Sequence, residues 1–298
     1  MTDDASLLYV EEEVRTALGA GAAVVALETT LVAHGFPPPD GIAVALEAED
    51  AVRAAGAVPA TIGALDGRVR VGLGRDELKR FTPDARKVGP RELASVAVQN
   101  AVGATTVGGT IAVARQVGIR FLGTGGIGGV HRGFATSGDV SADLPALART
   151  PILVSSSGVK SLLDVSATLE LLETLGVPVL GYRTDTLPLF YSRQGGPPIP
   201  ERVENPADAA RIAAAHWDLG GAGLLLANPP PESLDVAELI EAALAQASAA
   251  GATGQAVTPF VLGFLHEHSG GRTREVNRKL VVANARLAAE TAVAFATL

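Results

Sequence analysis

The stretch ILVSSSGVKSLLDVSATLELLETLGVPVLGY, residues 152–182, indicates the fold class. It predicts a short apolar strand at 152–154, a helix at 159–175 and a second strand at 177–182. The same alternation continues with a helix at 207–219, a strand at 223–227 and a helix at 234–249. Strands that alternate with helices predict a largely parallel sheet covered by helices. We therefore expect an α/β protein with three α/β/α layers.

The N-terminal half extends this pattern. It predicts helices at 6–18, 42–55 and 91–102, buried strands at 22–27 and 119–122, and a glycine-containing turn into a helix at 104–113. Residues 59–73 instead alternate with period two around Asp66-Gly67, which indicates an antiparallel hairpin. From residue 258 the chain is expected to be helical, with a break at SGGRT. With no internal repeat or linker, we expect a single domain, 1–298, with a small hairpin lobe at about 58–80.

Composition excludes several functional classes. The 298 residues contain no cysteine, so thiolate metal sites and cysteine nucleophiles are ruled out. A net charge of −8 without a basic tract disfavours nucleic-acid binding. The acidic N-terminus argues against a signal peptide, and the lack of a long apolar run argues against a membrane span. We expect a cytoplasmic protein whose partner is a small molecule, with no nucleic-acid or membrane partner.

A glycine-rich segment, GTGGIGGVHRG at 123–133, follows the strand predicted at 119–122. Its backbone N–H groups are suited to an anion such as phosphate, beside His131 and Arg132. The spacing matches neither a P-loop nor a dinucleotide fingerprint. Binding and purely structural interpretations of this loop both remain open.

Two acidic residues, Asp139 and Asp143, lie four positions apart on either side of Ser141. Paired carboxylates suit a hard divalent ion such as Mg²⁺ or Mn²⁺, with water as the remaining ligands. A solvated turn that caps a helix is the alternative, and the residues alone slightly favour that alternative.

Lysine is scarce in this chain, because only Lys79, Lys87, Lys160 and Lys279 accompany twenty arginines. An amine can attack a carbonyl and form an imine, whereas guanidinium cannot. Lys160, between a Ser/Gly turn and an apolar helix, is therefore a candidate nucleophile, although composition alone also explains a few lysines. Glu28 ends a predicted strand, where a carboxyl group suits general acid catalysis or a structural hydrogen bond.

Among the histidines, His34 is interpreted as a local hydrogen-bonding residue. His266 and His268 lie two apart and would not share a helix face, so they are not expected to form a metal pair.

Motifs along the chain resemble one known family, the pseudouridine-5′-phosphate glycosidases. The similar segments are ALETTLVAHGFP, GAVPATIGALDGRVRVGL, ARKVGPRELA, GTGGIGGVHRG, DVSADL, SGVKSLLD, VPVLGYRTDTLPLFYSR, LLLANP and TPFVLGFLHEHSGG. They run in order from about residue 24 to the C-terminus. The hydroxyl residue after Glu28 is Thr29, where relatives often have serine, and no residue named below is missing.

The resemblance implies an activity, a metal and an assembly. The activity is reversible cleavage of the C–C glycosidic bond of pseudouridine 5′-phosphate to uracil and ribose 5-phosphate, by a homotrimer of α/β/α subunits. The cofactor is one Mn²⁺ ion per subunit, mostly water-coordinated, with Asp139 as its protein ligand. Lys160 would be the nucleophile that forms a lysine imine after ribose ring opening, and Glu28 would be the proton donor.

The resemblance also assigns substrate contacts. These residues are Lys87, Val107, Ser141, Ala142, Asp143, Thr124, His131 and Asn284, with Asn277 in a matching C-terminal segment. Two other readings remain: another phosphosugar lyase of the class I aldolase type, and a non-catalytic phosphosugar-binding protein. Uracil release separates the first activity from both.

Overall fold

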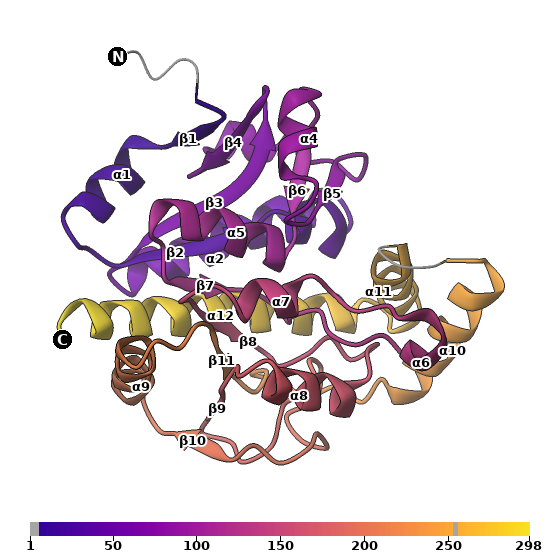
Figure 1. The fold of residues 1–298 in the computed structure, drawn as a ribbon. Coiled ribbons are helices and arrows are strands. Elements are labelled where there is room, and N and C mark those ends of the chain that lie inside the picture. The colour runs from indigo at the N-terminus through magenta and orange to yellow at the C-terminus, as the bar shows by residue number, and fades with distance from the viewer. Residues whose placement is uncertain (1–5, 253–255) are drawn as a thin grey trace.

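The computed structural model describes residues 6–252 and 256–298, and within them eleven strands form one sheet (Figure 1). These strands are β1 (Leu8–Val10), β2 (Val24–Glu28), β3 (Val58–Leu65), β4 (Arg68–Val71), β5 (Arg86–Val88), β6 (Gly103–Thr105), β7 (Phe121–Gly123), β8 (Leu153–Ser156), β9 (Val179–Tyr182), β10 (Glu201–Val203) and β11 (Leu224–Ala227).

The sheet is largely parallel, as the sequence predicts. The strand order is β1-β4-β3-β2-β7-β8-β11-β9-β10, with β6 paired to β3 and β5 paired to β6. Among these eleven strands, only β3 with β4 and β3 with β6 are antiparallel pairs. The hairpin forms around Asp66 and Gly67 as expected, and its first strand, β3, also pairs in parallel with β2. The hairpin is therefore continuous with the main sheet.

Helices cover the sheet in two outer layers, so the expected α/β/α arrangement is confirmed (Figure 1). The long C-terminal helix α12 crosses β2, β7 and β8 and packs beside α2 and α9, while α5 and α7 pack together on the other face. The helices are α1 (Glu12–Gly19), α2 (Asp40–Ala54), α3 (Arg75–Leu78), α4 (Leu93–Val98), α5 (Val107–Val117), α6 (Phe134–Ser137), α7 (Asp143–Leu147), α8 (Val165–Thr174), α9 (Pro206–Asp218), α10 (Ala237–Ala249), α11 (Val257–His268) and α12 (Arg272–Ala296), with a π-helical turn, η2 (Leu31–Gly35).

The central strands are buried on both faces. Every residue of β2, β7, β8 and β11 is buried, which explains their continuous apolar sequence. Gly123 lets α12 approach the sheet closely, because a Cβ atom there would lie 2.7 Å from the Cα of Ala285. The helix layer thus holds the C-terminal ends of these strands in fixed positions.

Three helix predictions need correction. Residues 8–10, predicted as helical, form edge strand β1, and α1 begins at Glu12 because the Glu11 side chain accepts a hydrogen bond from the Glu13 backbone N–H. The helix predicted at 91–102 covers only α4, after which the chain enters β6. The helix predicted from residue 159 begins at Val165, since Asp164 is its N-cap and accepts from the Ala167 N–H at 3.0 Å. The predicted break at SGGRT is confirmed by the end of α11 and the start of α12.

Candidate active site

A cavity of about 940 Å³ opens at the C-terminal ends of the parallel strands. Glu28 from the end of β2, Lys87 from β5, Thr124 after β7 and Lys160 after β8 all line it. Ligands in open α/β sheets bind at this edge, because the loops that follow neighbouring strands converge there. The fold therefore brings residues far apart in sequence to one site.

Lys160 lies in a loop that continues the strand pairing beyond β8. The Lys160 N–H donates to the Ile127 carbonyl at 3.1 Å, and the Ile127 N–H donates to the Gly158 carbonyl at 3.1 Å. Gly158 has a φ of +72°, and a Cβ atom there would lie 2.2 Å from the Pro188 carbonyl oxygen, so this turn requires glycine. The lysine is therefore held by the glycine-rich loop beside it, instead of by a helix terminus.

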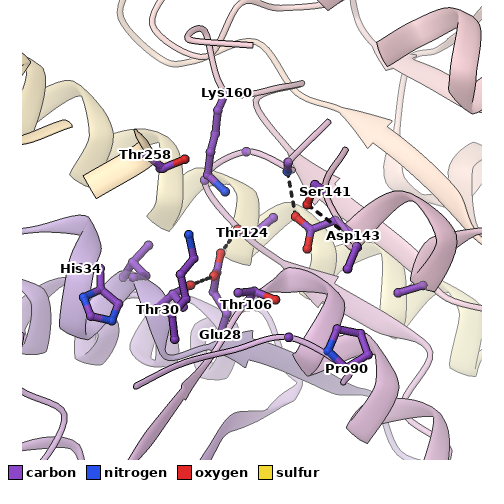
Figure 2. A pocket seen from close by; sticks show the side chains of 18 of the residues that line it. Glu28, Thr30, His34, Pro90, Thr106, Thr124, Ser141, Asp143, Lys160 and Thr258 are labelled. Carbon is purple, nitrogen blue, oxygen red and sulfur yellow. Dashed lines mark hydrogen bonds between the residues drawn. The ribbon is translucent and has the colours of Figure 1, made fainter. Parts of the chain in front are cut away.

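The scarce lysines divide into two structural classes. Lys79 and Lys279 form surface ion pairs with Asp76 and with Glu232 and Glu275, respectively. Lys87 and Lys160 instead line the cavity. Within the described residues, no hydrogen bond or ion pair holds the Lys160 ammonium group, and Figure 2 shows it pointing into the cavity.

Burial lowers the pKa of Lys87, and the nearby positive charge of Lys160 lowers it further. The carboxylates of Asp143 and Glu28 oppose this shift. A buried amine with a lowered pKa loses its proton more readily, so Lys87 gives up its proton more easily than an exposed lysine does.

Glu28 lies opposite Lys160 and is held by two hydroxyl groups (Figure 2). Thr30 Oγ1 donates to one carboxylate oxygen, and Thr124 Oγ1 donates to the other. The Glu28 residue is only 8% exposed, and its carboxylate forms part of the cavity wall. The two hydroxyl groups fix the orientation of the carboxyl group toward the cavity.

Asp143 joins the glycine-rich loop to helix α5. Its Oδ1 accepts from the Gly108 N–H at 2.7 Å, and its Oδ2 accepts from the Gly128 N–H at 2.8 Å. Gly128 has no room for a side chain, because a Cβ atom there would lie 2.3 Å from Ser141 Oγ. Ser141, Ala142 and Asp143 therefore line the cavity in fixed positions, next to the glycine-rich loop.

His131 and Asp139 face each other at the cavity wall, with His131 Nδ1 3.7 Å from Asp139 Oδ2. Burial lowers the pKa of His131, and the charges of Lys87 and Lys160 lower it too, while Asp139 opposes the shift. Within residues 6–252 and 256–298, no group of three or more His, Cys, Asp or Glu residues is placed to hold a metal ion. The Asp139 carboxylate, 34% exposed, still fits an ion that takes most of its ligands from water.

The structure brings most predicted site residues together, with two exceptions. Glu28, Lys87, Thr124, His131, Asp139, Ser141, Ala142, Asp143, Lys160 and Asn277 line the cavity. Val107 and Asn284 do not. Asn284 is fully buried and donates to the Thr124 carbonyl at 2.8 Å and to the Gly125 carbonyl at 3.2 Å, so it supports the glycine-rich loop from behind.

Several cavity residues were not selected from the sequence. Thr30 follows Glu28 by two positions, and this spacing was the available signal for its hydrogen bond. His34 also lines the cavity, and its buried Nε2 atom finds no hydrogen-bond partner among the described residues. Arg91, Arg115, Arg149, Phe190 and Thr258 also belong to this group, and no local motif distinguishes them.

Among the described helices, none is both long enough and apolar enough to cross a lipid bilayer.

The fold and the cavity define a class of α/β proteins in which a lysine and a carboxylate face each other at the edge of a parallel sheet. The chain belongs to the indigoidine synthase A-like protein family, whose model matches residues 13–294. This membership agrees with the resemblance found in the sequence motifs.

Relatives cover the full length of the chain. A protein of Nocardioides sp. named pseudouridine-5′-phosphate glycosidase is 48% identical over 100% of both chains. A protein of the same name from Deinococcus radiodurans is 46% identical over 98% of this chain and 96% of its own.

Two solved structures are similar as well. The prealnumycin C-glycosynthase AlnA, in complex with ribulose 5-phosphate, has a TM-score of 0.87 and 40% identity over 98% of each chain. An indigoidine synthase A-like protein from Thermotoga maritima has a TM-score of 0.87 and 35% identity over 98% of each chain.

Proposed function

We propose that this protein is an enzyme that reversibly cleaves the C–C glycosidic bond of pseudouridine 5′-phosphate to uracil and ribose 5-phosphate. The observation that carries the proposal is the placement of Lys160 opposite Glu28 in one cavity. Full-length relatives named for this activity support the choice of substrate. A structural relative that is a C-glycosynthase complexed with ribulose 5-phosphate supports a phosphosugar in this cavity.

The bond to be broken explains why an amine is needed. C1′ of pseudouridine is bonded to a carbon of uracil, so two-carboxylate glycosidase chemistry lacks a heteroatom leaving group. In the proposed reaction the ribose ring opens at the C1′–O4′ bond, the Lys160 amine bonds to C1′, and the proton that the amine loses ends on O4′, which becomes a hydroxyl group. Glu28 then gives a proton to the uracil carbon.

Cleavage follows from this arrangement. The electrons of the carbon–carbon bond return to the uracil ring, while the nitrogen lone pair of Lys160 forms a C=N bond with C1′. Water adds to this imine and releases ribose 5-phosphate and the free amine. The sum is substrate plus water giving uracil plus ribose 5-phosphate, and the reverse sequence joins them.

Substrate orientation is assigned to the residues around the two reacting side chains. We assign the phosphate to the glycine-rich loop, with contacts from Lys87, His131 and the 141–143 segment, because these groups all line the cavity and the charge of Lys87 acts on His131. Thr124 contributes through Glu28, to which its hydroxyl donates. Val107 and Asn284, which lie outside the cavity lining, are assigned supporting positions.

The metal belongs to this proposal too. Asp139 would hold Mn²⁺, one ion per subunit, together with water molecules. Such an ion supplies positive charge that orients and polarises substrate oxygens. A homotrimer in the cytoplasm completes the proposal, on the basis of the family resemblance.

The test is uracil release from pseudouridine 5′-phosphate in the presence of Mn²⁺. A parallel sample contains ribose 5-phosphate and borohydride, which reduces an imine to a stable amine. Uracil, together with a sugar phosphate attached to Lys160, is the expected result. Folded protein that releases no uracil but still traps ribose 5-phosphate at Lys160 would indicate a different phosphosugar lyase, and the absence of both would indicate a binding protein.

A further inference from the structure

The cavity extends beyond the residues assigned to the substrate, along a groove between α5 and α7. Ala112, Arg115 and Gln116 line it from α5, at spacings of three and four that place them on one helix face. On the opposite wall, the lining residues Ala142, Pro145, Ala146 and Arg149 follow the same spacing along α7 and just past its end. The two helices pack against each other, and Ala142 at the inner end belongs to the proposed substrate site.

Two arginines at the outer part of this groove lack carboxylate partners. Among the described residues, neither Arg115 nor Arg149 forms a hydrogen bond or ion pair, and both are exposed. Other arginines of this chain do pair with carboxylates, namely Arg53, Arg70, Arg80, Arg91, Arg132, Arg202, Arg211, Arg274 and Arg278. The groove therefore carries two uncompensated positive charges.

The carboxylates that line the cavity interact with groups other than Arg115 and Arg149. Glu28 accepts from two threonine hydroxyls, and Asp143 accepts from two backbone N–H groups. Glu92 accepts from Arg91 and from the Gly89 N–H. Asp139 faces His131. Hence none of them neutralises Arg115 or Arg149.

We propose that Arg115 and Arg149 form an outer anion subsite that holds the phosphate of a phosphosugar ligand as it enters or leaves the inner cavity. This inference rests on the proposed function for the identity of the ligand. A phosphate ligand needs a local positive charge to approach, because a protein of net charge −8 repels a phosphate dianion at long range. Two guanidinium groups on the cavity lining reduce that repulsion locally and raise the association rate. Guanidinium also suits phosphate because its N–H groups bind two oxygens at once.

The experiment compares the double variant Arg115→Gln/Arg149→Gln with a matched control, Arg193→Gln/Arg286→Gln. The control removes the same charge from exposed arginines that do not line the cavity. Initial rates with pseudouridine 5′-phosphate are measured at low ionic strength and at about 1 M KCl, where the Debye length falls to about 3 Å.

At low ionic strength, kcat/KM of the groove variant should fall about tenfold while kcat stays unchanged. The difference from the wild type should disappear at high salt, and the control should behave as the wild type. Equal losses in the groove variant and the control would overturn the subsite, as would a loss of kcat that persists at high salt.

A binding measurement separates this proposal from the proposed function. Ribose 5-phosphate is titrated into each protein by calorimetry at low ionic strength. The wild type and the control should bind ribose 5-phosphate with equal affinity, and the groove variant should bind it more weakly. If this order of affinities is found in a wild-type protein without glycosidase activity, the subsite is supported and only the assigned reaction is wrong. Identical affinities in all three proteins would overturn the subsite.

Discussion

Thr124 Oγ1 donates a hydrogen bond to Glu28 Oε1 across 96 positions of the chain. The threonine lies just after β7, and the glutamate ends the neighbouring strand β2. Thr30 Oγ1 donates to the other carboxylate oxygen, so both oxygens of Glu28 have fixed partners. The proposed proton donor is therefore oriented by the pairing of two parallel strands.

Replacing either threonine should reduce the rate of the chemical step. Thr30→Val and Thr124→Val remove a hydroxyl but keep the side-chain shape, so Glu28 should lose orientation while the cavity stays intact. We expect kcat to fall about 10- to 100-fold, since positioned acid catalysis contributes about 10²–10⁴-fold. Steady-state kinetics measure the change, and Thr30→Ser or Thr124→Ser should recover most of the activity. Valine variants with wild-type kcat would show that the hydroxyls do not position the acid.

Lys160→Ala should fold normally and lose at least about 10³-fold of uracil-releasing activity, because the amine is the proposed covalent nucleophile. Lys160→Arg should be equally inactive, since guanidinium retains the charge but does not form the imine. Borohydride trapping followed by peptide mass analysis should find no adduct in either variant. Lys279→Ala, at a surface ion pair, is the control and should keep full activity. Substantial turnover by Lys160→Arg would exclude the imine.

Asp143→Asn should destabilise the protein. Its two oxygens accept from the Gly108 and Gly128 N–H groups, and an amide side chain offers one acceptor oxygen in place of two. One buried N–H would lose its partner, at a cost of about 1–3 kcal/mol in the free energy of unfolding. Urea denaturation measures this change. Asp164→Asn is the control, because asparagine also caps helices well, and an equal loss in both variants would argue against a special role for Asp143.

Acidification should destabilise the protein partly through His34. Burial lowers the pKa of this histidine, the charge of Lys87 lowers it further, and a backbone hydrogen bond involving Ala85 opposes the shift. The unfolded chain therefore takes up the proton more readily. Neutral His34 therefore contributes to the free energy of unfolding above the histidine pKa of the unfolded chain, about 6.5. This contribution is lost as the pH falls below that value.

Unfolding free energies at pH 7.5 and 5.5 test this linkage. The decrease should be smaller in His34→Asn than in the wild type, while His268→Asn, at an exposed position, should keep the wild-type decrease. A decrease in His34→Asn as large as that of the wild type would contradict the contribution of His34.

Metal removal should suppress the proposed activity. Chelator treatment is expected to lower uracil release, and added Mn²⁺ should restore it. Asp139→Asn should need a higher Mn²⁺ concentration for half-maximal activity, because a neutral amide oxygen binds a hard cation less strongly than a carboxylate does. Titration of activity against Mn²⁺ measures this shift. An enzyme that is insensitive to chelator would remove Asp139 from the site.

Local sequence signals singled out several residues that line the cavity, and they missed others that only distant contacts bring there. Lys160 and Glu28 stand out by residue type and by position after an apolar strand. Arg115 and Arg149 do not, because they resemble other surface arginines until the packing of α5 against α7 places them on one cavity. Asn284 matched a family segment, yet its side chain supports the backbone of the glycine-rich loop.

The sequence by itself determined the α/β class, the hairpin at Asp66-Gly67 and the break between α11 and α12. These features depend on hydrophobic period and on turn residues, which are local properties of the chain. Only the tertiary structure decided that the segment around Lys160 pairs with the glycine-rich loop, although its apolar residues look helical. Backbone hydrogen bonds between Ile127 and residues 158 and 160 hold this part of the segment against the glycine-rich loop, and a turn at 161–163 then leads to Asp164, the N-cap of α8. Such long-range partners leave no periodic signal in the sequence.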